Sequence, residues 1–174
     1  MYRFSFLLIV VVILFSQITY SQSAIAVEIK TNVNTIDCEV AAASIHTSRG
    51  NLSKGYTISI PVEQLGCPDG VTKDLIKHLN AKEYPNIKFT VCDIEYDIDN
   101  KTHPKTLKVD VQVADKVVTY SFNVVVASIS DEEYITGTLG LQLAHFNIEP
   151  PTKMLGLVKV KDRINISFSL PIAS

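Results

Sequence analysis

The fold is decided by residues 133–170, which contain EYITGTLGLQLAHF at Glu133–Phe146 and RINISFSL at Arg163–Leu170. In the first run, odd positions from Ile135 to Leu143 are apolar or glycine, and even positions are threonine, glycine or glutamine. In the second run, the even positions are apolar and the odd positions are polar. A period of two residues is typical of a β-strand with one buried face and one solvated face. The stretch therefore predicts two such strands.

The same alternation recurs through most of the chain. Residues 55–65 and 86–96 each predict one strand, and the apolar parity of the latter changes near Cys92-Asp93, which predicts a β-bulge. Residues 107–126 predict a hairpin, because two alternating runs flank a tight turn at Ala114-Asp115-Lys116. Residues 25–45 add one or two strands, with a break expected at Thr31-Asn32.

One segment, residues 71–81, changes from the strand period to the helical period. Its apolar residues fit one helical face, and Asp69 or Thr72 is expected to cap the first turn. The chain therefore predicts about seven or eight strands and one short helix. Strands with one apolar face form a sandwich or a closed barrel, and we expect an antiparallel, lipocalin-like β-barrel of about eight strands. Such a barrel encloses either its own side chains or one small apolar ligand.

The N-terminus predicts export. Arg3 precedes an apolar run, Phe6–Phe15, which is shorter than the about 20 residues that span a bilayer. Residues 1–21 are predicted to be a cleaved signal peptide, with cleavage after Ser21, and an uncleaved anchor is the alternative. Residues 22–174 then form one domain, located in the periplasm or secreted.

Three cysteines remain after this segment: Cys38, Cys67 and Cys92. In an exported protein two of them are expected to pair. We favour Cys38–Cys67, since both lie near strand ends, and expect Cys92 to be a free thiol within a strand. No C-x-x-C or close Cys/His pair occurs, so no metal site is predicted.

The sequence carries no catalytic signature. It has no G-x-S-x-G motif and no Gly-rich phosphate loop, and none of its four histidines has metal-ligand spacing. Its formal net charge of −2 comes from scattered residues, which does not favour a nucleic-acid partner. We therefore expect a protein that is not an enzyme and uses no cofactor.

Four segments resemble the YceI-like proteins, a family of exported bacterial barrels with a lipocalin-like shape. They are TNVNTIDC (Thr31–Cys38), VTKDLIKHLNAKEYPNIKFTV (Val71–Val91), GTLGLQLAHFNIEPP (Gly137–Pro151) and MLGLVKVKDRINISFSL (Met154–Leu170). The second contains the L-x-x-x-x-Y-P-x-I-x-F pattern that marks the family. The chain departs from the larger members at its N-terminus, where a longer first strand would be expected.

The resemblance implies an apolar lipid partner, such as a polyisoprenoid or a fatty-acid derivative, held by apolar contacts inside the barrel. The inward positions of the best strands are then the predicted ligand contacts: Ile58, Ile60, Phe89, Val111, Phe122, Val124, Leu139, Leu141, Ile166 and Phe168. The mouth of the cavity is predicted at His145 and Phe146. The alternative is a structural or interaction barrel whose interior is filled by its own side chains, because alternation alone does not distinguish the two.

Overall fold

The computed structural model describes residues 24–48, 52–68, 70–99, 103–129 and 132–171. The predicted signal peptide, residues 1–21, lies outside the described residues. The described chain is mostly β, and its elements are β1 (Ala24–Thr31), β2 (Thr35–Val40), η1 (Ala42–Ser44), β3 (His46–Thr47), β4 (Thr57–Pro61), η2 (Val62–Gln64), β5 (Leu65–Gly66), α2 (Val71–His78), β6 (Asn86–Tyr96), β7 (Pro104–Val113), β8 (Lys116–Ile129), β9 (Glu132–Gln142), η3 (Leu143–Phe146), β10 (Thr152–Lys153) and β11 (Val158–Pro171).

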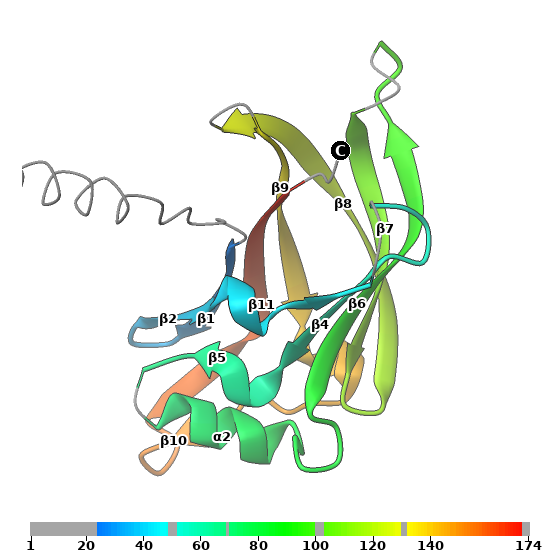
Figure 1. Ribbon diagram of the computed structural model, residues 1–174. Helices are drawn as coiled ribbons and strands as arrows, with labels where there is room; N and C mark the ends of the chain where they lie inside the picture. Colours follow the sequence, from blue (N-terminus) through cyan, green and yellow to red (C-terminus); the bar gives the residue numbers. More distant parts are fainter. Residues whose placement is uncertain (1–23, 49–51, 69, 100–102, 130–131, 172–174) are drawn as a thin grey trace, which may run out of the picture.

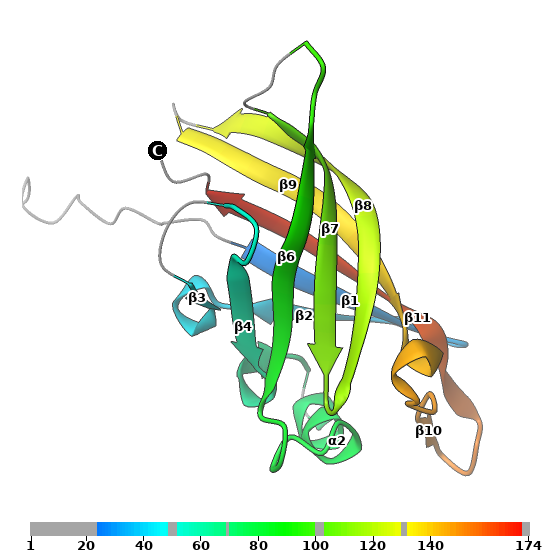
Figure 2. The same ribbon diagram turned by 90° about the vertical axis from the view of Figure 1, so that its right-hand side faces the viewer.

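The strands pair antiparallel in the order β3-β4-β6-β7-β8-β9-β11-β1-β2-β5, with β10 paired to β11 (Figures 1 and 2). The sheet curls into a half-barrel. One end of this order, β5, follows β4 near the other end directly in the chain: Pro61 ends β4, the 3₁₀ turn η2 redirects the chain, and Leu65-Gly66 then pairs with β2. The predicted antiparallel, lipocalin-like architecture is confirmed, and eight of the described strands have five or more residues.

The two strands that decide the fold are neighbours. Leu139 lies opposite Ile166 and Gly137 lies opposite Phe168 in the β9–β11 register. On its other side β11 pairs with β1, where Ile25 lies opposite Phe168. The β9–β11 pair therefore lies inside the sheet order rather than at its closing edge.

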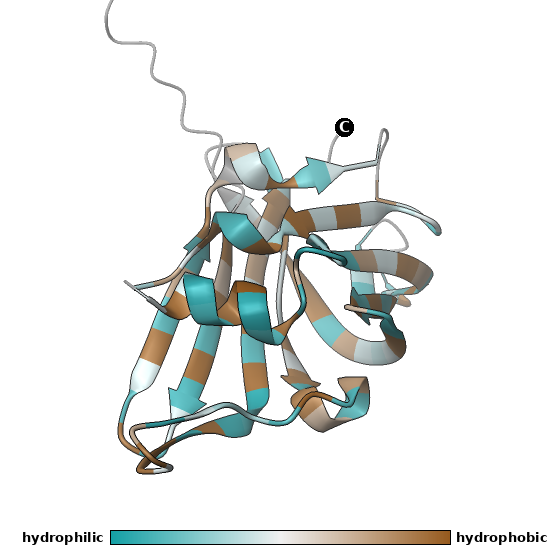
Figure 3. Ribbon diagram, turned by 90° about the horizontal axis from the view of Figure 1, so that it is seen from below, coloured by the Kyte–Doolittle hydropathy of each residue, from teal (hydrophilic) through white to brown (hydrophobic). Residues whose placement is uncertain are grey.

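Strand alternation places apolar side chains inside and polar side chains outside. In β7, Val109 and Val111 are buried whereas Lys108 is exposed, as the period of two requires. Figure 3, which views the barrel from the α2 end, shows apolar and polar bands alternating along the strands. The predicted bulge in β6 is confirmed, because its register with β7 shifts between Val91 and Asp93.

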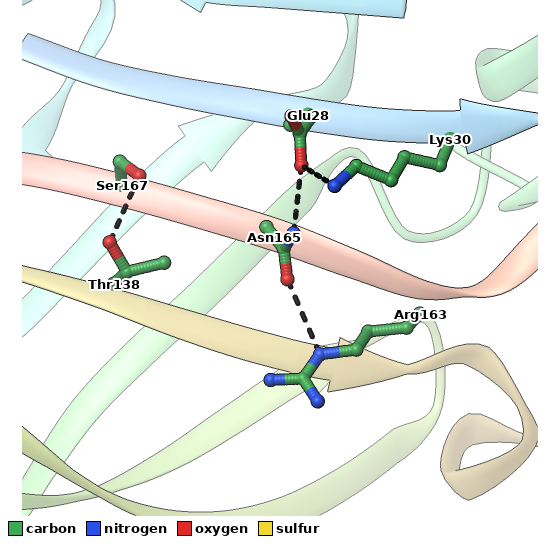
Figure 4. Close-up of polar contacts among 6 residues, drawn as sticks. All are labelled: Glu28, Lys30, Thr138, Arg163, Asn165 and Ser167. Atoms are coloured by element: carbon green, nitrogen blue, oxygen red, sulfur yellow. Dashed lines mark hydrogen bonds and ion pairs between the residues drawn. The ribbon is translucent and has the colours of Figure 1, made fainter. Parts of the chain in front are cut away.

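The outer face of β1, β11 and β9 carries a polar network (Figure 4). Asn165 Nδ2 donates to Glu28 Oε1 at 2.8 Å, and Lys30 Nζ lies 3.1 Å from the same oxygen. The Asn165 amide, and then Lys30, lower the pKa of Glu28 from its ordinary value. Thr138 and Ser167 hydroxyls bond at 3.1 Å across β9 and β11. This face is therefore solvated, and the apolar face of the same strands must be covered from within.

The helix α2 lies at one end of the barrel (Figure 1). It begins as predicted at Val71 and ends at His78, with Asn80 in a left-handed turn at φ 49°. The cap prediction is wrong for Thr72, because its hydroxyl donates to the Leu65 carbonyl at 2.9 Å and the N-cap is Gly70 at φ 83°. Asp69, the other predicted cap, lies outside the described residues. A glycine adopts this positive φ at no steric cost, so the helix starts without a side-chain cap.

A disulfide joins Cys38 of β2 to Cys67, which precedes α2; this is the pairing favoured from the sequence. Cys92 is a free thiol in β6. The bridge fixes the segment that enters α2 against β2, so the N-terminal end of the helix is held over the barrel end. Among the described residues, no helix is long and apolar enough to cross a membrane.

Candidate ligand-binding site

Residues of the described part of the chain line two neighbouring cavities in the barrel interior. The larger has a volume of about 550 Å³ and the smaller about 60 Å³. Ile25, Phe89 and Ile166 line both and therefore form the partition between them. Ligand pockets have volumes of roughly 300–1,000 Å³, whereas about 60 Å³ suits only a water-sized guest. The larger cavity is thus the candidate site.

Three structural parts enclose the larger cavity. The first is the inner face of the sheet, where β1 and β2 contribute Val27, Ile29 and Ile36, and β4, β6, β7, β9 and β11 contribute further apolar residues. The second is the apolar face of α2, and the third is the connection from η3 to β11. Residues of α2 and of this connection lie at the same end of the barrel (Figures 1 and 2). The cavity therefore lies between the sheet and a cover made of one helix and one long connection.

Polar side chains gather on this cover. Asp74, Lys77 and His78 of α2 line the cavity, together with Thr152 and Lys153 of β10. Lys153 forms an ion pair with Asp74. His78 Nε2 donates to the Glu149 carbonyl oxygen at 2.6 Å. Both contacts tie α2 to the connection, and the exposed ion pair is expected to be weak on its own. The site thus combines an apolar interior with a polar, partly solvated rim.

The smaller cavity has an aromatic wall. The rings of Phe122 and Phe168 meet edge to face, with centroids 5.8 Å apart and an interplanar angle of 78°. Gly137, opposite Phe168 on β9, leaves room for that ring. Aromatic pairs of this geometry attract beyond the effect of their burial. This half of the barrel is therefore nearly filled by its own side chains.

The residues predicted as ligand contacts divide between the cavities. Those that line only the smaller one are Ile58, Phe122, Leu139 and Phe168. Ile60 and Leu141 line only the larger one, and Phe89 and Ile166 line both. Val111 and Val124 line neither cavity, and both are buried in the hydrophobic core.

The predicted mouth residues have different surroundings. Phe146 is buried and lines the larger cavity. His145 is exposed, lines neither cavity, and its Nδ1 lies 3.0 Å from the Tyr120 hydroxyl. Tyr120 also stacks near Phe146, with ring centroids 6.3 Å apart. His145 is therefore part of the outer support of η3, and the polar rim of the cavity is formed by α2 and β10 instead.

The sequence-based prediction missed the contribution of β1 and α2. The sequence nevertheless indicates that these residues face the interior. Val27 and Ile29 alternate with Glu28 and Lys30, and Leu75 lies on the apolar face of the helix. Within the part of the chain that the structure describes, no group of His, Cys, Asp or Glu residues is arranged to hold a metal ion.

Comparisons with known proteins identify the fold. No family model and no curated protein matches the sequence. The structure is similar to Burkholderia cenocepacia BcnA, with a TM-score of 0.67, 17% identity, and coverage of 88% of this chain and 98% of that chain. It is also similar to the Campylobacter jejuni YceI protein, with a TM-score of 0.53, 15% identity, and coverage of 75% and 80%.

A third similar structure is a polyisoprenoid-binding domain from Saccharophagus degradans, with a TM-score of 0.55, 10% identity, and coverage of 87% and 94%. The chain has a YceI-like fold. At these identities the similarity concerns the backbone arrangement alone. In this chain, the side chains of α2, β1 and β10 contribute to the shape and polarity of the candidate site.

Proposed function

We propose that the protein is an exported carrier that holds an apolar lipid, an isoprenoid or acyl chain, in the larger cavity. The observation that supports this most is an apolar cavity of about 550 Å³ with a polar rim inside a YceI-like barrel. The similar Saccharophagus degradans domain is described as polyisoprenoid-binding, which favours the same ligand class. The chain of the lipid lies among Val27, Ile29 and Leu75, and its polar end lies at the α2–β10 rim.

Apolar burial supplies enough free energy for this role. Each Å² of apolar surface removed from water contributes about 25 cal/mol, so a chain that buries roughly 400 Å² gains about 10 kcal/mol. Association costs at least about 4 kcal/mol of this. The remainder, at most about 6 kcal/mol, corresponds to a Kd of roughly tens of micromolar or weaker, which suits a carrier that must also release its ligand. We propose that the protein acts by binding and not by catalysis.

The alternative function is a structural or interaction barrel with a self-filled core. Packed protein interiors contain few voids larger than a water molecule. The smaller cavity fits that description, but the larger one does not. The volume of the larger cavity therefore favours ligand binding over the self-filled barrel.

A matched pair of β1 variants tests the proposal. Val27→Trp places an indole in the larger cavity, whereas Ala26→Trp places one on the solvated face of the same strand. We expect cis-parinaric acid, an apolar fluorescent chain, to bind the wild-type protein and Ala26→Trp and to bind Val27→Trp at least about tenfold more weakly. Equal binding by all three proteins would place the probe elsewhere and refute the proposed site.

The mass of the protein recovered from bacterial cells tests whether it is exported. The disulfide Cys38–Cys67 supports an oxidising compartment. We expect the protein recovered from a bacterial periplasm to have Gln22 as its first residue, as measured by intact mass. A full-length mass in the membrane fraction would instead support an uncleaved anchor.

A further inference from the structure

An apolar surface lies beside the rim of the larger cavity. It consists of Val33, Met154, Leu155 and Leu157, and we call it the apolar tip. Leu155 is fully exposed, and Met154, Leu157 and Val33 are exposed by 70%, 72% and 67%. Exposed apolar residues that gather on one surface mark an interaction site, whereas scattered ones do not.

Hydrogen bonds join the two turns that form the apolar tip. Asn32 Nδ2 donates to the Leu157 carbonyl oxygen at 2.9 Å, and the Lys159 amide donates to Asn32 Oδ1 at 2.8 Å. The β1–β2 turn that carries Val33 is therefore fixed to the β10–β11 turn. Both turns project from the same side of the barrel (Figures 1 and 2).

The backbone of the tip is held in an unfavourable conformation. Met154 and Leu155 have φ angles of 52° and 56°, and the Gly156 amide donates to the Lys153 carbonyl at 3.1 Å. Two consecutive positive φ angles suit Asn-Gly, and side chains with a Cβ adopt them at a cost of about 1 kcal/mol or more each. The turn thus presents two large apolar side chains to solvent where small polar residues would be more stable.

The two turns of the tip carry lysines and no acidic residue of their own. Residues 150–161 contain Lys153, Lys159 and Lys161, and residues 29–36 contain Lys30. Lys153 and Lys30 form ion pairs with Asp74 and Glu28, so the positive charge beyond these pairs comes from Lys159 and Lys161. Apolar residues bordered by lysines match the chemistry of a membrane interface, where apolar groups enter the acyl boundary and each lysine near an anionic surface contributes about 1 kcal/mol. A protein partner with an apolar acidic surface would need no cavity beside it.

Residues that flank the apolar tip in β10 and β11 also line the larger cavity. Thr152, Lys153, Val158 and Val160 face the larger cavity, while the tip residues do not. We propose that the apolar tip docks onto the surface of an anionic phospholipid bilayer and thereby places the α2–β10 rim against the membrane, where a lipid chain passes between bilayer and barrel. The inference rests on the proposed lipid-carrying function.

The test measures co-sedimentation of the purified protein with two kinds of vesicle. One contains equal parts of phosphatidylcholine and phosphatidylglycerol, and the other contains phosphatidylcholine alone. The N-terminus of the purified protein is established beforehand by mass spectrometry. Met154→Asn/Leu155→Gly removes the apolar side chains and installs the residues that the turn favours, so folding is retained. We expect this variant to bind anionic vesicles at least about tenfold more weakly than wild type. Val125→Thr, which removes a 65% exposed apolar residue on the outer face of β8, is the matched control and should bind like wild type.

Charge is tested separately with Lys159→Gln/Lys161→Gln, which is expected to lose the preference for anionic vesicles. The inference is overturned if Met154→Asn/Leu155→Gly binds anionic vesicles as tightly as wild type, or if wild type does not bind them. It is also overturned if wild type is a dimer in sedimentation equilibrium and does not bind vesicles, while Met154→Asn/Leu155→Gly is a monomer. That result would assign the tip to contact with a second copy of the chain. Solution binding of cis-parinaric acid separates the two proposals, because it depends on Val27 and not on the tip.

Discussion

At the scale of single residues, two glycines of β9 have opposite surroundings although they are three positions apart. A Cβ added at Gly137 would lie 2.8 Å from Cζ of Phe168 and 3.2 Å from a methyl group of Val124. The nearest atoms to a Cβ added at Gly140 would instead belong to the exposed guanidinium group of Arg163. Gly137 is therefore required by core packing, while Gly140 lies under an exposed, flexible side chain that a 3.3 Å hydrogen bond to Asn165 holds.

This difference predicts opposite effects on stability. Gly137→Ala overpacks the aromatic wall and is expected to lower the free energy of unfolding by about 1–3 kcal/mol. Gly140→Ala displaces only Arg163 and should leave stability unchanged or raise it by up to about 1 kcal/mol, since glycine weakens a strand. Urea denaturation monitored by circular dichroism measures both. Equal losses for the two variants would contradict the assigned packing of Phe168.

The free thiol shows a second effect of local surroundings. Burial, and then a hydrogen bond with Asp110, raise the pKa of the Cys92 thiol from its ordinary value. The Thr119 hydroxyl, and then Cys92, lower the pKa of Asp110. Cys92 is thus poorly reactive near neutral pH, so its replacement is a suitable control for variants that remove the disulfide.

At the scale of elements, the helix α2 depends on contacts at both ends. The Cys38–Cys67 disulfide holds the segment before it, and the Thr72 hydroxyl bonds to Leu65 in the first turn. At its other end His78 bonds to the Glu149 carbonyl. The helix has only eight residues, which is too short to be stable alone, so these contacts and its apolar face hold it over the cavity.

The disulfide is therefore expected to stabilise both the fold and the cavity cover. With a sequence separation of 29, loop closure predicts a contribution of about 3–4 kcal/mol. Cys38→Ala/Cys67→Ala should lose about this much free energy of unfolding and bind cis-parinaric acid more weakly, whereas Cys92→Ser should change neither by much. Reducing agent should destabilise wild type and Cys92→Ser alike. Stability that does not respond to reduction would contradict this role.

At the scale of the whole molecule, local patterns predicted the elements but not their assembly. The bulge at Cys92-Asp93 and the start of α2 follow from changes of period, which the sequence displays directly. The position of β11 between β9 and β1 depends on pairing between distant segments, and no local pattern encodes it. The N-cap residue of α2, Gly70, was not predicted, because cap prediction relies on side chains and Gly70 has none.

The candidate site was only partly predictable for a related reason. Val111 and Leu141 show the same inward alternation, yet Val111 is sealed within the wall and Leu141 lines the larger cavity. Whether an inward residue meets a void depends on how well the opposite side of the barrel is filled. Here Phe122 and Phe168 fill one half, while the mainly Ile, Leu and Val side chains under α2 leave the other half open.

An open cavity of this size predicts a strong dependence of stability on ligand. A ligand that binds only the folded state stabilises it by about 2.7 kcal/mol at one hundred times its Kd, which corresponds to a rise in Tm of roughly 5–10 °C for a chain of this length. We expect a saturating apolar chain to raise the Tm of wild type, Ala26→Trp and Met154→Asn/Leu155→Gly to this extent, because neither substitution touches the cavity lining. Val27→Trp should show little or no rise, since its indole already occupies the space that the ligand would fill. Thermal denaturation monitored by circular dichroism measures the four shifts, and a rise in Val27→Trp equal to that of wild type would show that the ligand stabilises the protein from outside the barrel.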